Sequence, residues 1–308
     1  MTVALESYEE HLQQKGNKLR SIVNTIARLR GWFLDAKQAV ATITPSQVRR
    51  VYEQRCAKGV SADTHRNELA EVRTWCRWLL ARGWLLADPT VGLQGVGRRR
   101  RGKAKLREME ARILGEWCLS CALTPAPRAD DHTAAAGETR RDRELGLAVG
   151  LVLLLGVRAG ELLERVARDV DASPGRVVLW IPDSKTEAGR RRLVVPEPLA
   201  TLLRARAGAL PSGAWLWQGE SGSGHRERTW LRKGLARLCT EAGVPVVCPH
   251  GLRGTHATLA EEAGTAGEAV ARQLGHTSHR VTEEHYLEAG TVERARGRAV
   301  MQIVGGGG

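Results

Sequence analysis

A single tyrosine stands in a polar, histidine-rich segment near the end of the chain. Tyr286 is one of three tyrosines in 308 residues, and its segment, GHTSHRVTEEHYLEAG, offers the ring little core to fill. A phenol with a pKa near ~10 is a weak nucleophile at neutral pH, because deprotonation costs about 4 kcal/mol, so attack requires a nearby base or positive charge. Tyr286 is therefore a candidate nucleophile if basic groups gather around it.

The pattern His-x-x-Arg, which pairs an imidazole with a guanidinium, occurs twice. His225 and Arg228 lie in SGSGHRERTW, which is typical of a loop entering a helix. His250 and Arg253 lie in CPHGLRGTHATLAEEAG, where a proline precedes them and an apolar helix begins. Residues three apart on a helix share a face. The second pair is therefore expected to present both side chains on one surface.

The order of the chemically capable residues indicates a family. The chain carries GVRAGELL, a lysine between two β-rich runs, PHGLRGTHA, QLGHTS and then the tyrosine, ten residues after the histidine of QLGHTS. In this order and these contexts the chain resembles the tyrosine recombinases, the phage integrase and Xer group. Glu161 matches an acidic residue common in that family. The tyrosine follows the final motif histidine by ten positions here and by nine in many members. The six matching positions are Arg158, Lys185, His250, Arg253, His276 and Tyr286.

The resemblance implies a role for each of these side chains. Tyr286 would attack a DNA phosphate, leaving a 3′-phosphotyrosine and a free 5′-hydroxyl. Arg158 and Arg253 would hold the non-bridging oxygens, since guanidinium forks bind phosphate in a bidentate manner. His250 would exchange the proton of the nucleophile, His276 would donate to a phosphate oxygen, and Lys185 would protonate the departing 5′-oxygen.

Neither a metal nor an organic cofactor is expected. The histidines at 276, 279 and 285 lack a carboxylate at the usual ligand spacing, and His285 remains an auxiliary contact beside the tyrosine.

The six residues also have purely structural alternatives. Arg158 could only pair with Glu161, Lys185 could be an ordinary hairpin-tip lysine, and His250 with Arg253 could cap a helix. His276 and Tyr286 could be core residues.

Net charge concentrates in one short segment. The chain carries +13 overall, and GVGRRRRGKAKLR at 95–107 holds seven basic residues and no acidic one. Its glycines and lack of apolar periodicity predict an extended linker. If these basic residues neutralised about seven phosphates, the logarithm of the DNA-binding constant would change with the logarithm of the salt concentration with a slope of about −6. We expect this linker to contact DNA through Arg98, Arg99, Arg100, Arg101, Lys103 and Lys105.

Before the linker the apolar spacing is helical. One helix is expected to bury Leu19, Ile22, Val23, Ile26, Leu29, Trp32 and Phe33, and ITPSQV predicts a helix start with Thr44 as cap, Pro45 at the first position and Gln47 completing a capping box. A further helix from about Ser61 turns Leu69, Val72, Cys76 and Leu79 inward. The tryptophans at 75, 78 and 84 are expected to pack this bundle rather than stack on bases, and Tyr8 and Tyr52 are expected to be structural.

After the linker, LREMEARILGEWCLSCAL predicts a helix and TPAPRADDHTAAAGETRRD a polar loop. LGLAVGLVLLLG predicts a buried helix that ends at Gly156, and RVVLWI with RRRLVVP predicts a hairpin around PDSKTEAG. We expect a mainly α (α+β) fold. The resemblance implies a SAM-like four-helix core-binding domain at 1–94, the basic linker at 95–107, and at 108–308 a mixed helical catalytic domain with a small antiparallel sheet and a C-terminal tail.

Composition excludes several classes. No run approaches 18 apolar residues and the start lacks a signal-peptide pattern, so we expect a cytoplasmic protein without membrane contact. The six scattered cysteines indicate reduced thiols, with Cys118 and Cys121 as half-buried helix residues.

The expected function is site-specific cutting and rejoining of double-stranded DNA at an inverted-repeat core site. A dimer would occupy one site and a tetramer would form at synapsis, with the tail from Leu287 docking on a neighbouring subunit. An accessory protein could be a further partner. Two alternatives stay open. One is a type IB topoisomerase-like enzyme that relaxes DNA, and the other is a non-catalytic DNA-binding regulator on a recombinase scaffold.

Overall fold

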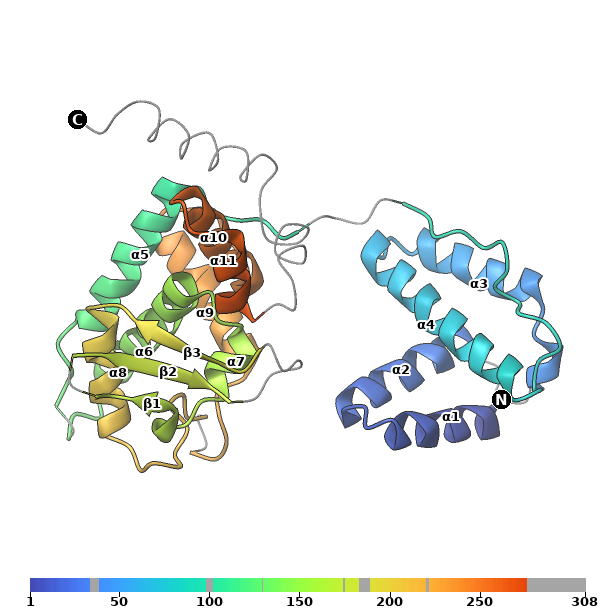
Figure 1. The fold of residues 1–308 in the computed structure, drawn as a ribbon, viewed down its shortest axis with the longest axis horizontal. Coiled ribbons are helices and arrows are strands. Elements are labelled where there is room, and N and C mark those ends of the chain that lie inside the picture. Colours follow the sequence, from blue (N-terminus) through green and yellow to red (C-terminus); the bar gives the residue numbers. More distant parts are fainter. Residues whose placement is uncertain are drawn as a thin grey trace. The chain divides into compact units, whose positions relative to one another are not determined.

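The chain divides into two compact units. The computed structural model describes residues 1–33, 39–97, 102–128, 130–173, 175–182, 189–219 and 222–275. The units are Met1–Arg100 and Arg101–Gly308 (Figure 1). Several predicted features lie outside the described residues: the four linker arginines at 98–101, the hairpin tip with Lys185, and everything from His276 onward, including Tyr286 and the tail.

The first unit is a bundle of four α-helices. They are α1 (Thr2–Gln14), α2 (Leu19–Trp32), α3 (Pro45–Ala57) and α4 (Ala62–Ala81). Helix α4 turns Leu69, Val72, Trp75, Cys76 and Leu79 into the core, and Trp78 and Trp84 pack partly buried against it. The predicted four-helix unit and the packing role of its tryptophans are confirmed.

The start of α3 follows the sequence pattern closely. The Thr44 hydroxyl accepts a hydrogen bond from the Gln47 amide at 3.3 Å, and the Gln47 side chain accepts one from the Thr44 amide at 3.0 Å. Pro45 occupies the first helical position, where its missing N–H leaves no gap in the helix. The predicted capping box is confirmed.

Helix α2 buries a narrower stripe than the sequence predicted. Ile22, Ile26 and Leu29 are buried, whereas Leu19 is 68% exposed and Val23 is 53% exposed. At about 100° per residue, Leu19 and Val23 lie on the flank of the stripe that faces the bundle. The prediction that both are core residues was wrong, because this flank of α2 is exposed while the buried stripe packs mainly against α1 and α4.

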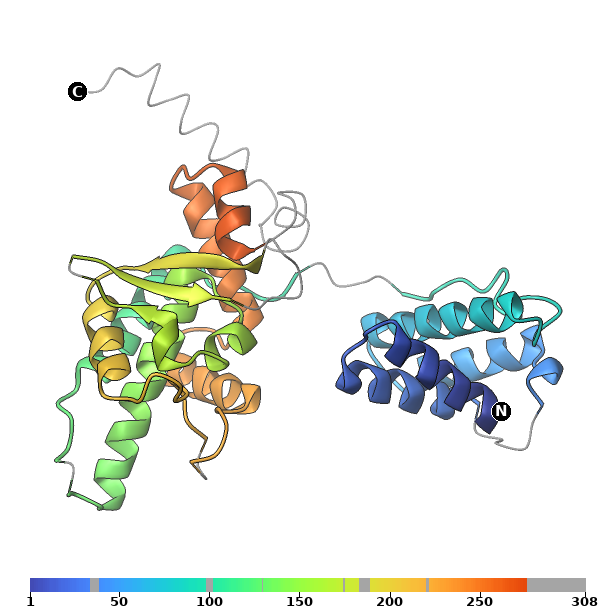
Figure 2. The ribbon, with the colours of Figure 1, turned by 60° about the horizontal axis from the view of Figure 1, so that its bottom comes forward.

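The second unit combines a small antiparallel sheet with a larger group of helices (Figure 2), and the sheet residues Arg192 and Val194 are exposed. The sheet order is β1 (Val170–Asp171), β2 (Val177–Ile181), β3 (Arg191–Val195), with Leu179 opposite Leu193 in the β2–β3 pairing. The predicted hairpin is therefore confirmed for its two strands. The helices are α5 (Glu108–Leu123), α6 (Ala134–Leu155), α7 (Ala159–Leu163), α8 (Leu199–Gly208), α9 (Arg228–Glu241), α10 (Pro249–Glu262) and α11 (Gly267–Leu274).

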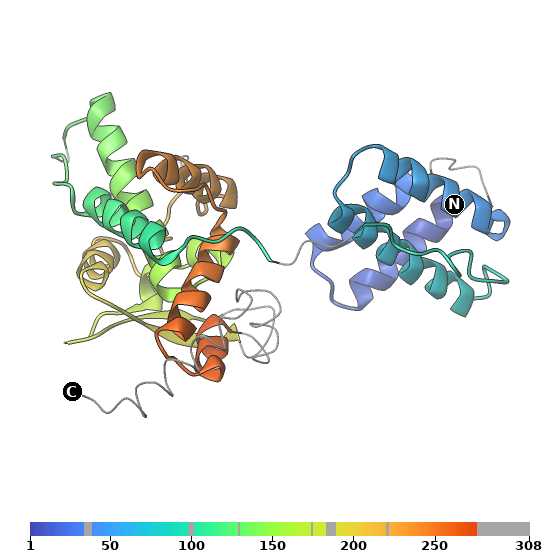
Figure 3. The same cartoon turned by 90° about the horizontal axis from the view of Figure 1, so that it is seen from above.

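Helix α6 is the central element of this unit and packs alongside α5 (Figure 3). Its second half, from Leu145, is almost entirely buried and ends before Gly156, as predicted. Its start was predicted wrongly, because the segment from Ala134 to Asp142 is helical rather than loop. The Thr133 hydroxyl accepts from the Ala136 amide at 3.2 Å, and a capped run of alanines favours helix over loop.

Both ends of the basic linker are anchored to the unit that they adjoin. Arg66 donates from Nη1 to the carbonyls of Gly95 and Gly97, and the Val96 amide donates to the Tyr52 hydroxyl at 2.9 Å. At the other end the Leu106 amide donates to the Thr255 hydroxyl at 2.9 Å. Tyr52 is 1% exposed, which fits its predicted structural role.

Two further observations bear on the composition-based predictions. Cys118 is fully buried rather than half-buried, and burial raises the pKa of its thiol well above the usual range. Among the helices that the structure describes, none combines the length and the apolar character needed to cross a membrane.

Candidate active site

The turn between α6 and α7 positions the first predicted site residue. Gly156 adopts a left-handed conformation, φ 62°, which ends α6 and turns the chain. Arg158 follows as the N-cap residue of α7, and its amide donates to the Glu161 carboxylate at 3.1 Å. The Arg158 side chain is 36% exposed, so this guanidinium is open to solvent.

Glu161 is a buried carboxylate shared by two arginines. Its Oε1 lies 2.5 Å from Nη1 of Arg158, and its Oε2 lies 2.8 Å from Nη2 of Arg191 on β3. Burial alone would raise the pKa of Glu161, but the hydrogen bonds and charges of Arg191 and Arg158 outweigh it, and the pKa lies below its ordinary value. The Arg158–Glu161 ion pair considered as a structural alternative therefore exists. It fixes the orientation of an arginine that still faces solvent.

Arg253 on α10 is fully buried and binds backbone rather than solvent. Its Nη1 donates to the Gly156 carbonyl and its Nη2 to the Leu274 carbonyl, both at 2.5 Å. These carbonyls belong to the C-terminal ends of α6 and α11, where the helix dipole favours a cation. Arg253 thus ties together the turns that lead to Arg158 and to His276.

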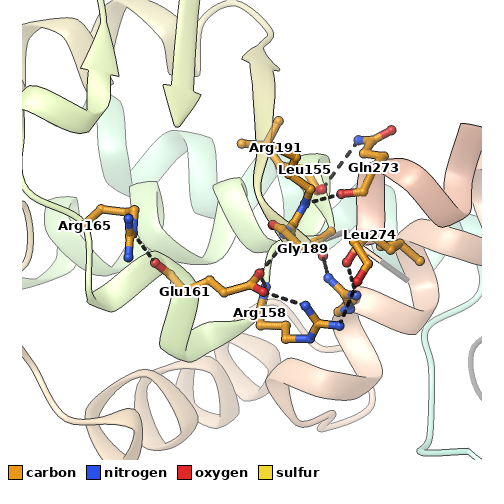
Figure 4. Close-up of polar contacts among 11 residues, drawn as sticks. Leu155, Arg158, Glu161, Arg165, Gly189, Arg191, Gln273 and Leu274 are labelled. Atoms are coloured by element: carbon orange, nitrogen blue, oxygen red, sulfur yellow. Dashed lines mark hydrogen bonds and ion pairs between the residues drawn. The ribbon is translucent and has the colours of Figure 1, made fainter. Parts of the chain in front are cut away.

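Three successive carbonyls at the end of α11 each face a guanidinium (Figure 4). Gln273 accepts from Nε of Arg191 at 2.5 Å, Leu274 accepts from Arg253, and Gly275 lies 3.5 Å from Nη2 of Arg158. Because the next residue is His276, three arginines from separate elements fix the point at which the chain enters the final predicted segment. The structure brings Arg158 and Arg253 together here.

His250 lies on the exposed side of the same helix. It occupies the first turn of α10, its side chain is exposed, and Cys248 is the N-cap, whose sulfur accepts from the Gly251 amide at 3.4 Å. His250 and Arg253 therefore share a helix but differ in environment. The imidazole can meet a solvent-side phosphate or phenol, and the guanidinium supports the site from within.

The described end of the linker packs on this helix. The Ala104 carbonyl would lie 2.1 Å from a Cβ at position 251, and the Lys105 stem would lie 3.1 Å from one at position 254, so both glycines permit this close approach. Lys103 is exposed and Lys105 is partly buried. Two of the predicted DNA-binding lysines therefore precede or overlie the helix of His250 and Arg253.

The other His-x-x-Arg pattern builds no comparable arrangement. His225 packs against Trp215 with ring centroids 5.2 Å apart, and its Nδ1 lies 2.8 Å from the Arg226 carbonyl. The Arg228 side chain is 72% exposed and lies 3.5 Å from Glu164. The structure therefore places the two patterns in different environments.

Over the described part of the chain, no group of three or more His, Cys, Asp or Glu side chains is arranged to hold a metal ion. The histidines at 276, 279 and 285 lie outside that part.

Comparison with known proteins decides the family. Residues 132–291, more than half of the chain, match the family described as the phage integrase family. The chain belongs to this family. It is a tyrosine recombinase, that is, a site-specific DNA recombinase, which confirms the resemblance inferred from the ordered residues.

Curated relatives agree with this membership. The chain is 28% identical over 256 residues to tyrosine recombinase XerC of Mycobacterium sp. (strain KMS), across 79% of this chain and 78% of the relative. It is 25% identical over 296 residues to tyrosine recombinase XerC of Mycobacterium tuberculosis (strain ATCC 25177 / H37Ra), across 92% and 93% of the two chains.

Solved structures show the same fold. A lambda integrase dimer bound to a COC′ core site aligns with a TM-score of 0.68 at 16% identity, over 92% of this recombinase and 94% of that chain. The Tn1549 transposon integrase in complex with circular intermediate DNA aligns with a TM-score of 0.72 at 15% identity, over 96% and 98%. The predicted mainly helical fold with a small antiparallel sheet is therefore confirmed.

Sequence reasoning missed Arg191 in this recombinase. Strand residues two apart face the same side of a sheet, so Arg191 shares its face with Leu193 and Val195, which are both buried. An arginine on the apolar face of a strand needs partners. That alternation was the signal that could have identified it.

Proposed function

We propose that this recombinase cuts one strand of a duplex core site through Tyr286 and reseals it to a partner strand. The phenolic oxygen would form a bond to phosphorus as the bond to the 5′-oxygen breaks, leaving a 3′-phosphotyrosine and a free 5′-hydroxyl. The observation that carries the proposal is the meeting of Arg158, Glu161 and Arg253 at the end of α11, one residue before His276.

The arginines are proposed to stabilise the charge of the five-coordinate transition state. Arg158 has the exposure and the fixed orientation to bind non-bridging oxygens directly. Arg253 is assigned to the same phosphate by the family pattern, but its buried contacts support a second role, which is to hold the turns on either side. Removal of Arg253 would then damage both geometry and charge.

The proton movements are assigned to three residues. His250 would take the phenolic proton, because it is exposed on the first turn of α10. His276 would donate to a phosphate oxygen, and Lys185 would give a proton to the departing 5′-oxygen. The reverse attack by a 5′-hydroxyl restores a phosphodiester and releases the tyrosine, so that resealing requires neither ATP nor a metal ion.

The first unit and the linker are proposed to bind the duplex. We assign 1–94 as the core-binding domain, 95–107 as the basic linker and 108–308 as the catalytic domain, with phosphate contacts from the arginines at 98–101 and from Lys103 and Lys105. A dimer on one inverted-repeat site and a tetramer at synapsis would follow, with an accessory protein as a further partner. Because the substrate is DNA, we propose a cytoplasmic location.

A strand-exchange assay tests this function. The purified protein is incubated with two differently labelled duplexes from its native genomic locus, and products are separated on denaturing gels. We expect a covalent protein–DNA adduct and a recombinant strand carrying both labels. Relaxation of any supercoiled plasmid without a recombinant strand would indicate a topoisomerase, and tight binding without an adduct would indicate a non-catalytic regulator. Either result would overturn the proposal.

A further inference from the structure

Arg191 joins three segments that lead to different predicted site residues. Its Nη2 binds Glu161 at 2.8 Å, its Nη1 donates to the Gly189 carbonyl at 2.7 Å, and its Nε donates to the Gln273 carbonyl at 2.5 Å. These contacts are drawn in Figure 4, and the residue is 8% exposed. A single buried guanidinium therefore uses each of its three nitrogens on a different part of the fold.

Each of these partners belongs to a segment of the sequence that carries a predicted catalytic residue. Glu161 orients Arg158 through their 2.5 Å ion pair. Gly189 is the residue at which the described chain resumes after the hairpin tip that holds Lys185. Gln273 lies three residues before His276. Arg191 itself faces the interior, so it is placed to act through these neighbours rather than on the phosphate.

Close packing strengthens this junction. Gly275 has φ 69°, and a Cβ there would lie 2.8 Å from Nη1 of Arg191 and 2.9 Å from the Cα of Gly189. The end of α11 and the return of the hairpin are therefore in contact, with Arg191 between them. A displacement at one side would be transmitted to the other, because close-packed groups leave no space to absorb it.

We propose that Arg191 is a positioning residue: through Glu161 it orients Arg158, and through Gly189 and Gln273 it fixes the described ends of the segments that lead to Lys185 and His276. This inference rests on the proposed cleavage reaction. Its loss would leave DNA binding intact and slow the chemical step, since misplacement of reacting groups by about 1 Å can cost about 10²-fold in rate.

The test compares Arg191→Gln with Arg192→Gln. Arg192 is the neighbouring strand residue, carries the same charge, points to the opposite face and packs over Trp180 at 5.4 Å. The single-turnover rate of adduct formation is measured at saturating protein on a nicked native-locus duplex, with DNA affinity and thermal unfolding measured in parallel. We expect a loss of about 10²-fold in rate for Arg191→Gln, with near-unchanged DNA affinity. We expect Arg192→Gln to match the wild type.

Two further measurements separate positioning from folding. Arg191→Lys keeps the charge beside Glu161 but cannot reach all three partners, so it should recover part of the rate. A duplex with sulfur in place of the 5′-bridging oxygen at the mapped cleavage position needs no protonation of its leaving group. The Arg191→Gln defect should shrink on it, because the contribution of Lys185 is bypassed.

Equal rates for Arg191→Gln and Arg192→Gln, or an equal defect on both duplexes, would overturn the inference. If the wild type itself forms no adduct, the proposed function fails instead, so the two failures are distinguishable.

Discussion

The two His-x-x-Arg patterns of this recombinase have the same sequence spacing and opposite surroundings. In the first, His225 packs on Trp215 before α9 begins, and Arg228 at the start of α9 is 72% exposed. In the second, both residues lie within α10 after Pro249, with His250 exposed and Arg253 fully buried. The two patterns therefore differ in their position relative to a helix and in the burial of the arginine.

The comparison shows that helix ends, rather than spacing alone, make the second pattern a site. Arg253 binds the last carbonyls of α6 and α11, which are acceptors without an intrahelical partner. Arg228 has a single long ion pair with Glu164 at 3.5 Å. The buried Arg253 links two turns through two hydrogen bonds, whereas the exposed Arg228 joins the start of α9 to the end of α7 only through this long ion pair.

Removal of the buried arginine should give the largest effect. Arg253→Gln withdraws the guanidinium from two buried carbonyls, each costing about 1–3 kcal/mol when unsatisfied, so we expect a loss of about 4 kcal/mol in the free energy of unfolding of the second unit. Arg228→Gln should change it by less than about 0.5 kcal/mol. Urea unfolding of the full chain, followed by circular dichroism, measures both. Similar losses in the two variants would contradict the contrast.

Replacement of the two histidines should separate the patterns in activity. His250→Ala removes the proposed acceptor of the phenolic proton and should slow adduct formation by about 10²–10⁴-fold, with little change in DNA affinity. His225→Ala removes a ring that packs on Trp215 and should leave the rate near that of the wild type. The measurement is the single-turnover rate on a nicked native-locus duplex. A slower His225→Ala than His250→Ala would reverse the assignment of the two patterns.

A third histidine, His256, also lies on α10, and its burial should make the stability of the fold depend on pH. Burial, the largest cause, lowers the pKa of His256 to about 4, and its Nδ1 donates to the Leu153 carbonyl at 3.0 Å. Between about pH 6.5 and pH 4 the unfolded chain therefore binds a proton that the folded chain does not. As the pH is lowered through that window, the free energy of unfolding should therefore decrease, with a total loss of about 3 kcal/mol.

His256→Gln serves as the comparison for this effect. The difference in unfolding free energy between the wild type and the variant, measured at steps from pH 7 to pH 4, should change steadily in favour of the variant as the pH falls. A difference that stays constant with pH would show that His256 does not carry the effect.

Much of this arrangement could be predicted from local sequence. The capping box at Thr44, the glycine that ends α6 and the two strands of the hairpin depend on short-range rules, and all three are confirmed. The resemblance to the family rested on the order and local contexts of six residues. The residues at 185, 276 and 286 lie outside the described part of the chain, so their roles stay predictions.

What could not be predicted depends on contacts between distant segments. In GRRRLVV the alternation with Leu193 and Val195 could have placed Arg191 on the buried face of the strand, but no local pattern shows that its partner there is Glu161, 30 residues away. Likewise, no local pattern shows that Arg253 reaches the carbonyl of Gly156, 97 residues away. Leu19 and Val23 fit a helical stripe in sequence, but no neighbouring helix covers that flank.

The nucleophile is the central claim, and trapping it is the most direct test. A nicked suicide duplex from the native locus is incubated with the wild type and with Tyr286→Phe, and the adduct is digested and sequenced by mass spectrometry. We predict a DNA-linked peptide containing Tyr286 and no adduct in the variant. An adduct that persists in Tyr286→Phe, or that maps to the buried Tyr8 or Tyr52, would contradict the account.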